Sequence, residues 1–429
     1  MSSPIFFVTP DASRAVGLAL LPIDLFLVTE RKDYTVAWLQ SQGIKTLVLS
    51  SNYNNTGKML EDGRTVKFLS DNSKTQAPNI LIFKPSDKID LIVKRNGYKL
   101  IANQGFLNKK FEDKVSFYRL CVRYKLPIPD SMISKLGELS FWQAKEMFGL
   151  PFIVQFGRGW AGSTTFFIYD ENKYLELQKK FFGTVVKFSQ KIDGITVLNN
   201  ACVTWDGKVL ISEPAVQIAG SLFGGLEGST FGRQWGGKLI SNSQKTKIRG
   251  ITQIVGSIMA REGYLGWFGL DFVISQNGKV LLSENNARLT ASFSFYTQLE
   301  VLAGSDSTLL SHHIASFLRE KLPTWQNQEF VGSQVSLRGD PERISYVKKS
   351  LPQGVYNENL GFCRYGVGVR DLKKASEVYI GFPQAGERLP KNSEIVSLEM
   401  NREVIDRKHN LYPETRQLSR SALSKVNCE

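Results

Sequence analysis

The first third of the chain alternates short apolar runs with polar turns and stretches of helical periodicity. The apolar runs cover residues 5–8, 25–28, 46–49, 80–83 and 99–102. Short apolar strands that recur with helical crossovers are typical of a small open α/β sheet. From residue 111 the apolar spacing becomes helical, and Pro127 and Pro129 end that helix. The pattern therefore predicts an N-terminal α/β domain over residues 1–110, followed by a helix.

The middle of the chain is rich in pairs of apolar strands around glycines. The predicted pairs are 152–156 with 165–169, 198–205 with 208–212, and 269–275 with 279–284. The second and third pairs enclose Asp206-Gly207 and Asn277-Gly278, and such dipeptides favour the positive φ angles of a two-residue type I′ turn. We therefore predict antiparallel hairpins with tight turns in this region.

The last third begins with two helical stretches and then changes character. Helices are predicted over about 291–302 and 309–320, and the polar segment 321–328 is typical of a linker. Residues 330–429 show short strands, turns and a terminal helix. We therefore predict a second domain over 111–325 and a β-rich C-terminal domain over 330–429, in a multidomain chain that combines α/β and α+β architecture.

The composition is that of a globular protein with several domains. The 429 residues are 42% hydrophobic and 22% charged, which excludes global disorder. The formal charge of +14 attracts anions, whether nucleotides, nucleic acid or acidic metabolites. The basic residues form no run of five or more, so nucleic-acid binding rests on charge alone. A generally basic, solvated surface explains the charge equally well.

Several classes of chemistry lack the residues they need. The four cysteines are far apart and form no C-x-x-C pair, which argues against a thiolate zinc site and a disulfide framework. Three histidines give a His-based catalytic triad little material. The apolar stretch 15–28 contains Pro22 and Asp24 and is too short to span a bilayer. We therefore expect a cytoplasmic protein without membrane association.

The hairpin around Asn277-Gly278 carries the most informative polar residues. A two-residue turn places Asp271 directly opposite Glu284, and like charges in that position repel unless a cation lies between them. Asn286 lies on the same face, and Arg288 points the same way toward any anion that the cation holds. Oxygen ligands of this kind suit Mg²⁺ with phosphate. The alternative is an ordinary surface hairpin whose carboxylates are merely solvated.

Two glycine-rich segments are further candidates. The segment 152–165 is a strand, a loop with Gly157, Gly159 and Gly162, and a second strand, in which Ser163 or Thr164 could donate to a phosphate oxygen. The alternative is a simple turn, and the segment is neither a Walker A loop nor a Rossmann fingerprint.

The second glycine-rich segment, 220–237, is longer than a simple turn needs. Its length is typical of a lid or binding loop, and we expect Arg233 and Gln234 to face an acceptor substrate. A mobile connection with no contact to substrate is the alternative.

Together these residues resemble the ATP-grasp superfamily, especially the branch of biotin carboxylase and the carbamoyl phosphate synthetase large chain. The specific motif is Asp271 followed by Glu284-Asn285-Asn286-Ala287-Arg288. Glu112-Asp113-Lys114, the hairpin at 157–163 and the connection 188–194 support it. The resemblance covers about residues 1–320 and implies an ATP-grasp fold that follows a Rossmann-like α/β domain.

The resemblance also implies roles for individual residues. Lys114 would contact nucleotide phosphate, 157–163 would form a flexible flap over the phosphates, and 186–192 would read adenine through its backbone. The nucleotide-binding positions implied in this way are Lys114, Gln155, Gly157, Arg158, Gly159, Gly162, Ser163, Thr164, Lys187, Phe188, Ser189 and Gln190. Asp271, Glu284 and Asn286 would hold one or two Mg²⁺ or Mn²⁺ ions. Arg288 would steady the transferring phosphoryl group.

The sequence departs from the superfamily pattern at two places. Gln155 occupies a position where a lysine or arginine normally reaches phosphate, and Arg158 or Lys187 is the candidate substitute. Ser189 and Gln190 stand where glutamates are common on the adenine side.

The resemblance implies an ATP-dependent ligase that joins a small carboxylate or peptide to an amine or other nucleophile through an acyl phosphate. A non-catalytic or regulatory nucleotide-binding protein is the alternative that the departures favour. Whether the chain forms a homo-oligomer stays open.

Overall fold

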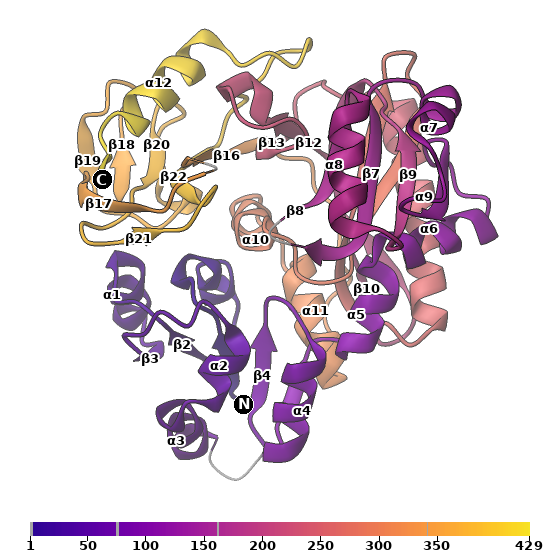
Figure 1. Ribbon diagram of the computed structural model, residues 1–429. Helices are drawn as coiled ribbons and strands as arrows, with labels where there is room; N and C mark the ends of the chain where they lie inside the picture. Colours follow the sequence, from indigo (N-terminus) through magenta and orange to yellow (C-terminus); the bar gives the residue numbers. More distant parts are fainter. Residues whose placement is uncertain (1–2, 74–76, 161–162, 341) are drawn as a thin grey trace.

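The computed structural model describes residues 3–73, 77–160, 163–340 and 342–429. Its strands form a five-stranded parallel sheet, a four-stranded sheet, an eleven-stranded sheet and a three-stranded sheet (Figure 1). The predicted mixture of α/β and α+β architecture is confirmed. None of the helices in this described part combines the length and the apolar character that crossing a membrane requires.

The N-terminal sheet has the strand order β3-β2-β1-β4-β5. Its strands are β1 (Ile5–Val8), β2 (Leu25–Thr29), β3 (Lys45–Val48), β4 (Asn79–Ile82) and β5 (Lys99–Ile101). They are parallel and lie where the apolar runs predicted them. The order reverses between β1 and β4, and in open α/β sheets ligands bind at the carboxyl ends of the strands beside such a point.

Both faces of this sheet are buried. Phe6 and Val8 of β1 pack with the helices α2 (Thr56–Glu61), α3 (Gly63–Asn72) and α4 (Asp87–Asn96). Ile5 and Phe7 face the opposite core. That core contains side chains of the helices α1 (Tyr34–Ser41), α10 (Phe293–Leu302) and α11 (Leu309–Leu318). The last two helices fall in the predicted second domain, so the N-terminal sheet packs directly against it.

The helix expected from residue 111 is in fact two helices. α5 (Gly105–Glu112) ends at Asp113, and α6 (Lys114–Arg123) begins there because the Asp113 carboxylate accepts a hydrogen bond from the Ser116 backbone N–H at 2.8 Å. This N-cap satisfies a donor that the first turn of α6 would otherwise leave unpaired. The break brings Glu112 and Lys114 close together on the two sides of the cap.

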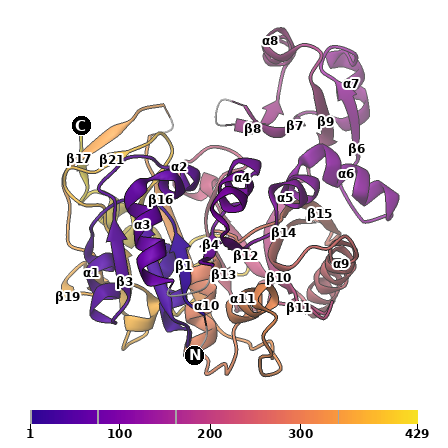
Figure 2. The same cartoon turned by 90° about the horizontal axis from the view of Figure 1, so that it is seen from below.

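Residues 131–190 form a small unit that we call the lid. Its sheet has the order β6-β9-β7-β8, and the helices α7 (Phe141–Phe148) and α8 (Glu171–Phe181) pack on it. The strands are β6 (Ser131–Lys135), β7 (Phe152–Trp160), β8 (Ser163–Ile168) and β9 (Val185–Gln190). The lid has an apolar core of its own that includes Phe152, Tyr174 and Phe188. Figure 2 shows the lid projecting away from the rest of the molecule.

The large antiparallel sheet forms the centre of the part of the molecule outside the lid and the N-terminal sheet. Its strand order is β15-β14-β10-β12-β13-β16-β22-β20-β18-β19, and β11 pairs with β10 off this path. The strands before residue 330 are β10 (Gly194–Val203), β11 (Val209–Ile211), β12 (Ala215–Ala219), β13 (Thr230–Trp235), β14 (Gly266–Ser275) and β15 (Val280–Asn286). The long helix α9 (Asn242–Arg261) packs against β10, β11 and β15. The three predicted hairpins are all present.

The strands after residue 330 continue this same sheet. β16 (Gly332–Arg338), β18 (Gly354–Tyr356), β19 (Phe362–Arg364), β20 (Val378–Gly381) and β22 (Glu394–Met400) belong to it. β17 (Ser345–Lys349), β21 (Arg388–Leu389) and β23 (Asn427–Cys428) form the three-stranded sheet, and α12 (Pro413–Leu423) is the terminal helix. Because β13 pairs with β16, hydrogen bonds join the two sides of the boundary expected at 325–330. The division into domains at 110 and 325–330 stays a prediction.

The two tight turns differ from the expected type. Ser275 and Lys279 pair across a three-residue loop, and Gly278 has φ of +79° while Asn277 does not have a positive φ. Thr204 and Lys208 enclose a loop of the same kind, in which Gly207 has φ of +83°. A type I′ turn needs positive φ at both central residues, so that prediction was wrong. The observed loop is a type I turn followed by a glycine bulge.

Candidate functional site

Asp271 and Glu284 are neighbours across the β14–β15 hairpin, as the sequence predicts. Phe272 pairs with Leu282, but Asp271 pairs with Glu284, so Ser283 is an extra residue in β15. After a three-residue loop, an uninterrupted ladder would set Asp271 opposite Ser283. The bulge shifts the register by one residue and restores the pair. The prediction of the pair is confirmed, although its two-residue turn was wrong.

Asp271 has two amide neighbours and one acidic one. Gln217 donates to its Oδ1 at 2.5 Å, and Asn286 donates to its Oδ2 at 2.9 Å. Removal of water by the surrounding protein raises the pKa of Asp271 to about 7, and the charge of Glu284 adds to that rise. Arg233 and Lys114 act in the opposite direction. The negative charges of Asp271 and Glu284 therefore repel each other, as the sequence predicts.

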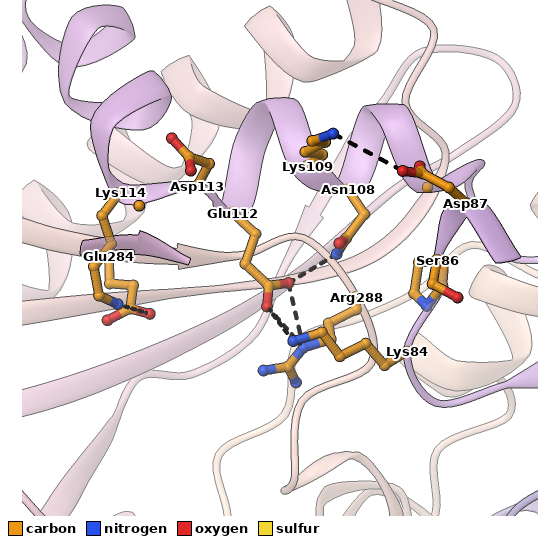
Figure 3. A pocket seen from close by; sticks show the side chains of 13 residues that line it. Lys84, Ser86, Asp87, Asn108, Lys109, Glu112, Asp113, Lys114, Glu284 and Arg288 are labelled. Atoms are coloured by element: carbon orange, nitrogen blue, oxygen red, sulfur yellow. Dashed lines mark hydrogen bonds and ion pairs between the residues drawn. The ribbon is translucent and has the colours of Figure 1, made fainter. Parts of the chain in front are cut away.

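Lys114 neutralises part of the negative charge of this acidic pair. Its Nζ lies 2.5 Å from Oε1 of Glu284, and its side chain is mostly buried at the first residue of α6 (Figure 3). The phosphate contact expected of Lys114 stays a prediction. In this structure its ammonium group is paired with one of the two acids instead.

Arg288 belongs to a second charged group, which the sequence analysis did not identify. Its Nε lies 3.3 Å from Glu112, its Nη2 donates to Oδ1 of Asn286 at 3.0 Å, and Lys84 pairs with Glu112 at 3.1 Å (Figure 3). Burial alone would raise the pKa of Glu112, but Arg288 and Lys84 lower it below its ordinary value. Lys84 follows β4 at the carboxyl end of the parallel sheet, and that position was the available signal for it.

A cavity of about 450 Å³ unites these residues. Lys84 follows β4, Glu112 and Lys114 flank the helix junction at Asp113, and Glu284 and Arg288 come from β15 and the residues after it (Figure 3). Gly157 of the lid strand β7 also lines it. A Cβ at residue 157 would lie 2.3 Å from Oδ2 of Asp113, so a larger residue there would require the N-cap side chain of α6 to move.

A second cavity lies on the other side of the acidic pair. It measures about 860 Å³ and is lined by Asp271, Glu284, Gln217 and residues of the glycine-rich segment 219–230. Glu284 lines both cavities. The acidic pair therefore stands where the two spaces meet.

The oxygen ligands fit a hard divalent cation. Two carboxylates face each other, and water removal makes their joint ionisation unfavourable without a positive partner. In the described ranges, no three or more His, Cys, Asp and Glu side chains cluster as a metal site. Mg²⁺ commonly binds through one or two carboxylates plus phosphate and water. The Oδ1 of Asn286 already accepts from Arg288, so the two acids are the stronger ligands.

Solved structures resemble this chain over its whole length. The biotin carboxylase domain of 2-oxoglutarate carboxylase from Hydrogenobacter thermophilus, in complex with MgADP, ADP and bicarbonate, is 12% identical. The match covers 100% of this chain and 90% of that one with a TM-score of 0.67. Biotin carboxylase from Campylobacter jejuni, in a β,γ-ATP complex, is 13% identical over 100% and 92% of the two chains, with a TM-score of 0.66.

A third similar structure is not a biotin carboxylase. N5-carboxyaminoimidazole synthase from Aspergillus clavatus, in complex with ADP and 5-aminoimidazole ribonucleotide, is 10% identical over 97% and 99%, with a TM-score of 0.62. The chain has the ATP-grasp fold. The likeness extends beyond residue 320, further than the sequence motifs reach. No protein-family model and no curated protein matches the sequence.

Within the ATP-grasp fold, the lid carries most of the expected nucleotide-binding positions. Gln155 and Lys187 are direct partners on β7 and β9, and both side chains are largely buried. Gln155 donates to Thr165 at 3.3 Å. Burial lowers the pKa of Lys187 to about 8, and the neighbouring charge of Lys114 acts in the same direction.

The remaining lid positions fall into three groups. Phe188 packs into the apolar core of the lid, Ser189 is buried within the sheet, and Gln190 is exposed at the end of β9. Gly162 lies outside the described residues. The side chains of Arg158, Ser163 and Thr164, and the surroundings of Gly159, lie outside them as well, although β7 and β8 include these four positions. Their expected roles stay predictions.

Arg233 and Gln234 lie in a strand rather than in a glycine-rich loop. Residues 230–235 form β13 in the middle of the large sheet, so the loop interpretation of 220–237 was wrong for this part. Adjacent strand residues point to opposite faces. Arg233 lines a cavity of about 140 Å³, whereas the buried Gln234 accepts from the backbone N–H groups of Val404 and Ile405 at 2.7 and 3.0 Å. Only Arg233 is carried further as a substrate contact.

Proposed function

We propose that the protein is an ATP- and Mg²⁺-dependent ligase that activates a carboxylate as an acyl phosphate. The observation that carries this proposal is the Asp271–Glu284 pair, which lies at the junction of two cavities with Lys114 and Arg288 beside it. The ATP-grasp fold supports it, as do neighbours whose crystals contain MgADP or ADP.

In this proposal Asp271 and Glu284 hold Mg²⁺, with Asn286 beside them. The ion, when bound, would supply positive charge that neutralises the phosphate oxygens and favours the departure of ADP. Lys114 exchanges Glu284 for a nucleotide phosphate, because the same flexible side chain lines the cavity of about 450 Å³. This exchange explains how a lysine that neutralises an acid in this structure would serve as a phosphate contact in the complex.

The reaction follows from where the charges lie. A substrate carboxylate oxygen attacks the γ-phosphorus, the bond from that phosphorus to the β,γ-bridging oxygen breaks, and ADP leaves. Arg288, which Asn286 and Glu112 hold in place, stabilises the negative charge on the transferring group. An amine or other nucleophile then attacks the acyl carbon, phosphate leaves, and the nucleophile gives up a proton.

Lys187 is the proposed replacement for the charge that Gln155 lacks. It lies directly opposite Gln155 on the adjacent strand, and the structure gives it no ion pair with any described residue. A buried ammonium group without a counterion is costly, and a nucleotide phosphate or ring nitrogen would supply a partner. The lid backbone at 157–163 is proposed to cover the phosphates.

A second candidate function is supported by the same departure. A regulatory protein that binds Mg-ATP without turning it over would also tolerate a neutral Gln155. It predicts nucleotide binding without ADP release for every substrate tried.

The test is a screen for ADP release with amino acids, short peptides and dicarboxylates, in which hydroxylamine traps any acyl phosphate. A competent substrate should give ADP and a hydroxamate. Asp271→Asn and Glu284→Gln should each lower that rate by roughly 100-fold or more. Glu262→Gln, at an exposed surface pair with Lys110, is the control and should leave the rate unchanged. Full ADP release by both acidic-site variants would refute the assignment.

A further inference from the structure

The cavity of about 140 Å³ that Arg233 lines is a separate, strongly charged space. It lies among the 3-10 helix η1 (Ala12–Ala15) after β1, the helix α10 and one face of β13, β16 and β22. Pockets for drug-sized ligands measure roughly 300–1,000 Å³, so this one suits a much smaller molecule. It opens at the carboxyl end of the parallel sheet, where α/β folds bind ligands.

The floor of the cavity is a row of polar residues across four strands. Arg233 pairs with Gln334, Gln334 with Glu399, and Glu399 with Tyr379. Direct partners in neighbouring strands place their side chains on the same face of a sheet. Further along β16 and β22, Arg338 pairs with Glu394 in the same way. The fold therefore gathers guanidinium and carboxylate groups from distant segments on one surface.

The charges in this row are incompletely satisfied. The Nε atoms of Arg233 and Arg338 are buried and have no hydrogen-bond partner, and the same holds for Oε1 of Gln298 on α10. Within the part of the chain that the structure describes, neither arginine is in an ion pair, although both share the cavity with Glu394 and Glu399. Buried polar groups in native proteins are almost always paired, so these groups point to a missing ligand.

The two acids of the row, Glu399 and Glu394, differ in their exposure to the cavity. Glu399 is buried, accepts from Gln334 at 3.2 Å and from the Val369 N–H at 2.9 Å, and burial raises its pKa to about 8. It is therefore mostly neutral and already hydrogen-bonded. Glu394 lies at the end of β22 with its side chain exposed to the cavity. Burial raises the pKa of Glu394 as well, whereas a hydrogen bond from Ser336 and the charges of Arg338 and Arg233 act in the opposite direction. Glu394 forms no ion pair with Arg233 in the described part of the chain, so a charged ligand could bridge the two.

The row also leads to the acidic pair. Gln217 on β12 is the direct partner of Arg233, and it donates to Asp271 at 2.5 Å while accepting from Thr230 at 2.7 Å. A ligand group held by Arg233 therefore lies one hydrogen-bonded residue away from the proposed metal site. That is where the carboxylate to be activated has to be.

We propose that this cavity binds the donor substrate and that the substrate is a small amino acid in its zwitterionic form. Its carboxylate pairs with Arg233, and the Nε of Arg338 is a second donor to the same molecule. Its ammonium group pairs with Glu394. A simple anion would match the arginines but would face Glu394 with no counter-charge, whereas a zwitterion matches both signs. This inference rests on the proposed ligase function and adds its substrate class.

The test is calorimetric titration of the full-length protein with single amino acids, without nucleotide. At least one small amino acid should bind, and its N-acetyl derivative, its amide and the corresponding carboxylic acid without the amino group should each bind at least tenfold more weakly. Arg233→Gln and Glu394→Gln should each weaken binding of the amino acid at least tenfold. Arg420→Gln, at an exposed position on α12, should have no effect.

The outcomes separate this inference from the proposed function. Mg-ADP binding without binding of any amino acid would overturn the inference and leave the ligase proposal standing. Equal binding of the carboxylic acid and the amino acid, or an unchanged affinity in Glu394→Gln, would overturn the zwitterion. If Arg233→Gln fails to fold, the amino-acid affinity of Glu394→Gln, a polar replacement at an exposed position, still tests the inference. The ligase proposal would fail if Asp271→Asn still released ADP at the full rate. That result comes from the turnover assay and is independent of the binding assay.

Discussion

The lid has a buried lysine directly opposite the neutral residue Gln155. Gln155 on β7 is neutral, and its direct partner on β9 is the buried Lys187. Sequence comparison with the superfamily identified the loss at Gln155, but two candidates for its replacement remained. The register of β7 with β9 favours Lys187, because it brings the ammonium group to the same place from the neighbouring strand.

We predict that Lys187→Gln weakens Mg-ADP binding by roughly tenfold or more, the usual cost of losing a charged hydrogen bond. The double variant Gln155→Lys with Lys187→Gln should recover much of the loss because it moves the charge back to β7. Lys179→Gln, at an exposed position on α8, is the matched control. Calorimetric titration measures all four proteins. Unchanged affinity in Lys187→Gln would show that this lysine has only a structural role.

A second residue-scale prediction concerns Glu300 on α10. It is buried, and its Oε1 accepts from Leu309 N–H and from Trp325 Nε1, both at 3.0 Å. Burial raises its pKa from 4.5 to about 8. Between these values the folded state holds a proton that the unfolded state has released. The free energy of unfolding therefore falls as the pH rises, by on the order of 3 kcal/mol between about pH 5 and pH 8.

Glu300→Gln has no proton to release, so its stability should lack this part of the pH dependence. Urea denaturation across that pH range measures the difference from the unmodified protein. Glu146→Gln, on the exposed side of α7, should keep the full dependence. The same slope in Glu300→Gln and in the unmodified protein would mean that Glu300 is ionised in the folded state.

The placement of site residues relative to one another could be predicted only where one motif contains them. Asp271, Glu284, Asn286 and Arg288 fall within one hairpin and its continuation, so their spacing gave their mutual placement. Glu112 reaches Arg288 from a distant segment of the chain, and Lys84 reaches Glu112 from another. A local sequence pattern does not indicate which distant carboxylate will neutralise an arginine. The fold brings Arg288, Glu112 and Lys84 together.

At the scale of the elements, the β14–β15 hairpin shows how two local deviations can cancel. The loop has one residue more than expected, and the bulge at Ser283 takes up that residue. The dipeptide Asn-Gly suits both a two-residue turn and a three-residue loop that ends in a glycine bulge. The sequence therefore predicted the hairpin reliably, whereas the turn type and the bulge depend on the twist of the sheet.

The turn type gives a stability prediction. Gly278 has φ of +79°, and alanine there should cost about 1 kcal/mol, whereas Asn277→Ala should cost less than about half of that because its φ is not positive. Gly250→Ala is the opposite control. It lies exposed in α9 with open space around its Cβ, so alanine should stabilise by about 0.5–1 kcal/mol. Equal losses for Gly278→Ala and Asn277→Ala in urea denaturation would instead support a type I′ turn.

At the scale of the whole molecule, the fold was predictable where neighbours in sequence pair with each other. The hairpins belong to this class, and so do the pairs β1–β2, β2–β3 and β4–β5 of the parallel sheet, whereas its β1–β4 pair joins strands that are not consecutive. The pairing of β13 with β16 joins segments nearly a hundred residues apart and makes one sheet of two predicted domains. The cavity of Arg233, Arg338 and Glu394 depends on that pairing, so sequence reasoning identified only Arg233 of the three.

The arrangement of the lid leads to a prediction about shape. The lid has its own core and projects from the body (Figure 2). The cavity of about 450 Å³ has Gly157 on the lid side and Lys84 and Glu284 on the body side. A nucleotide that contacts both sides should draw them together. Small-angle X-ray scattering should show a smaller radius of gyration with Mg-ADP than without it. The same radius at saturating Mg-ADP would contradict closure of the lid.

We propose that Asp271 and Glu284 hold a divalent cation together. The most direct measurement is anomalous X-ray scattering from a crystal grown with Mn²⁺ and ADP. We expect a manganese peak within coordination distance of both carboxylates, with the Lys114 ammonium moved from Glu284 toward phosphate. Bound ADP with no peak between the acids, and with Lys114 still paired to Glu284, would contradict it.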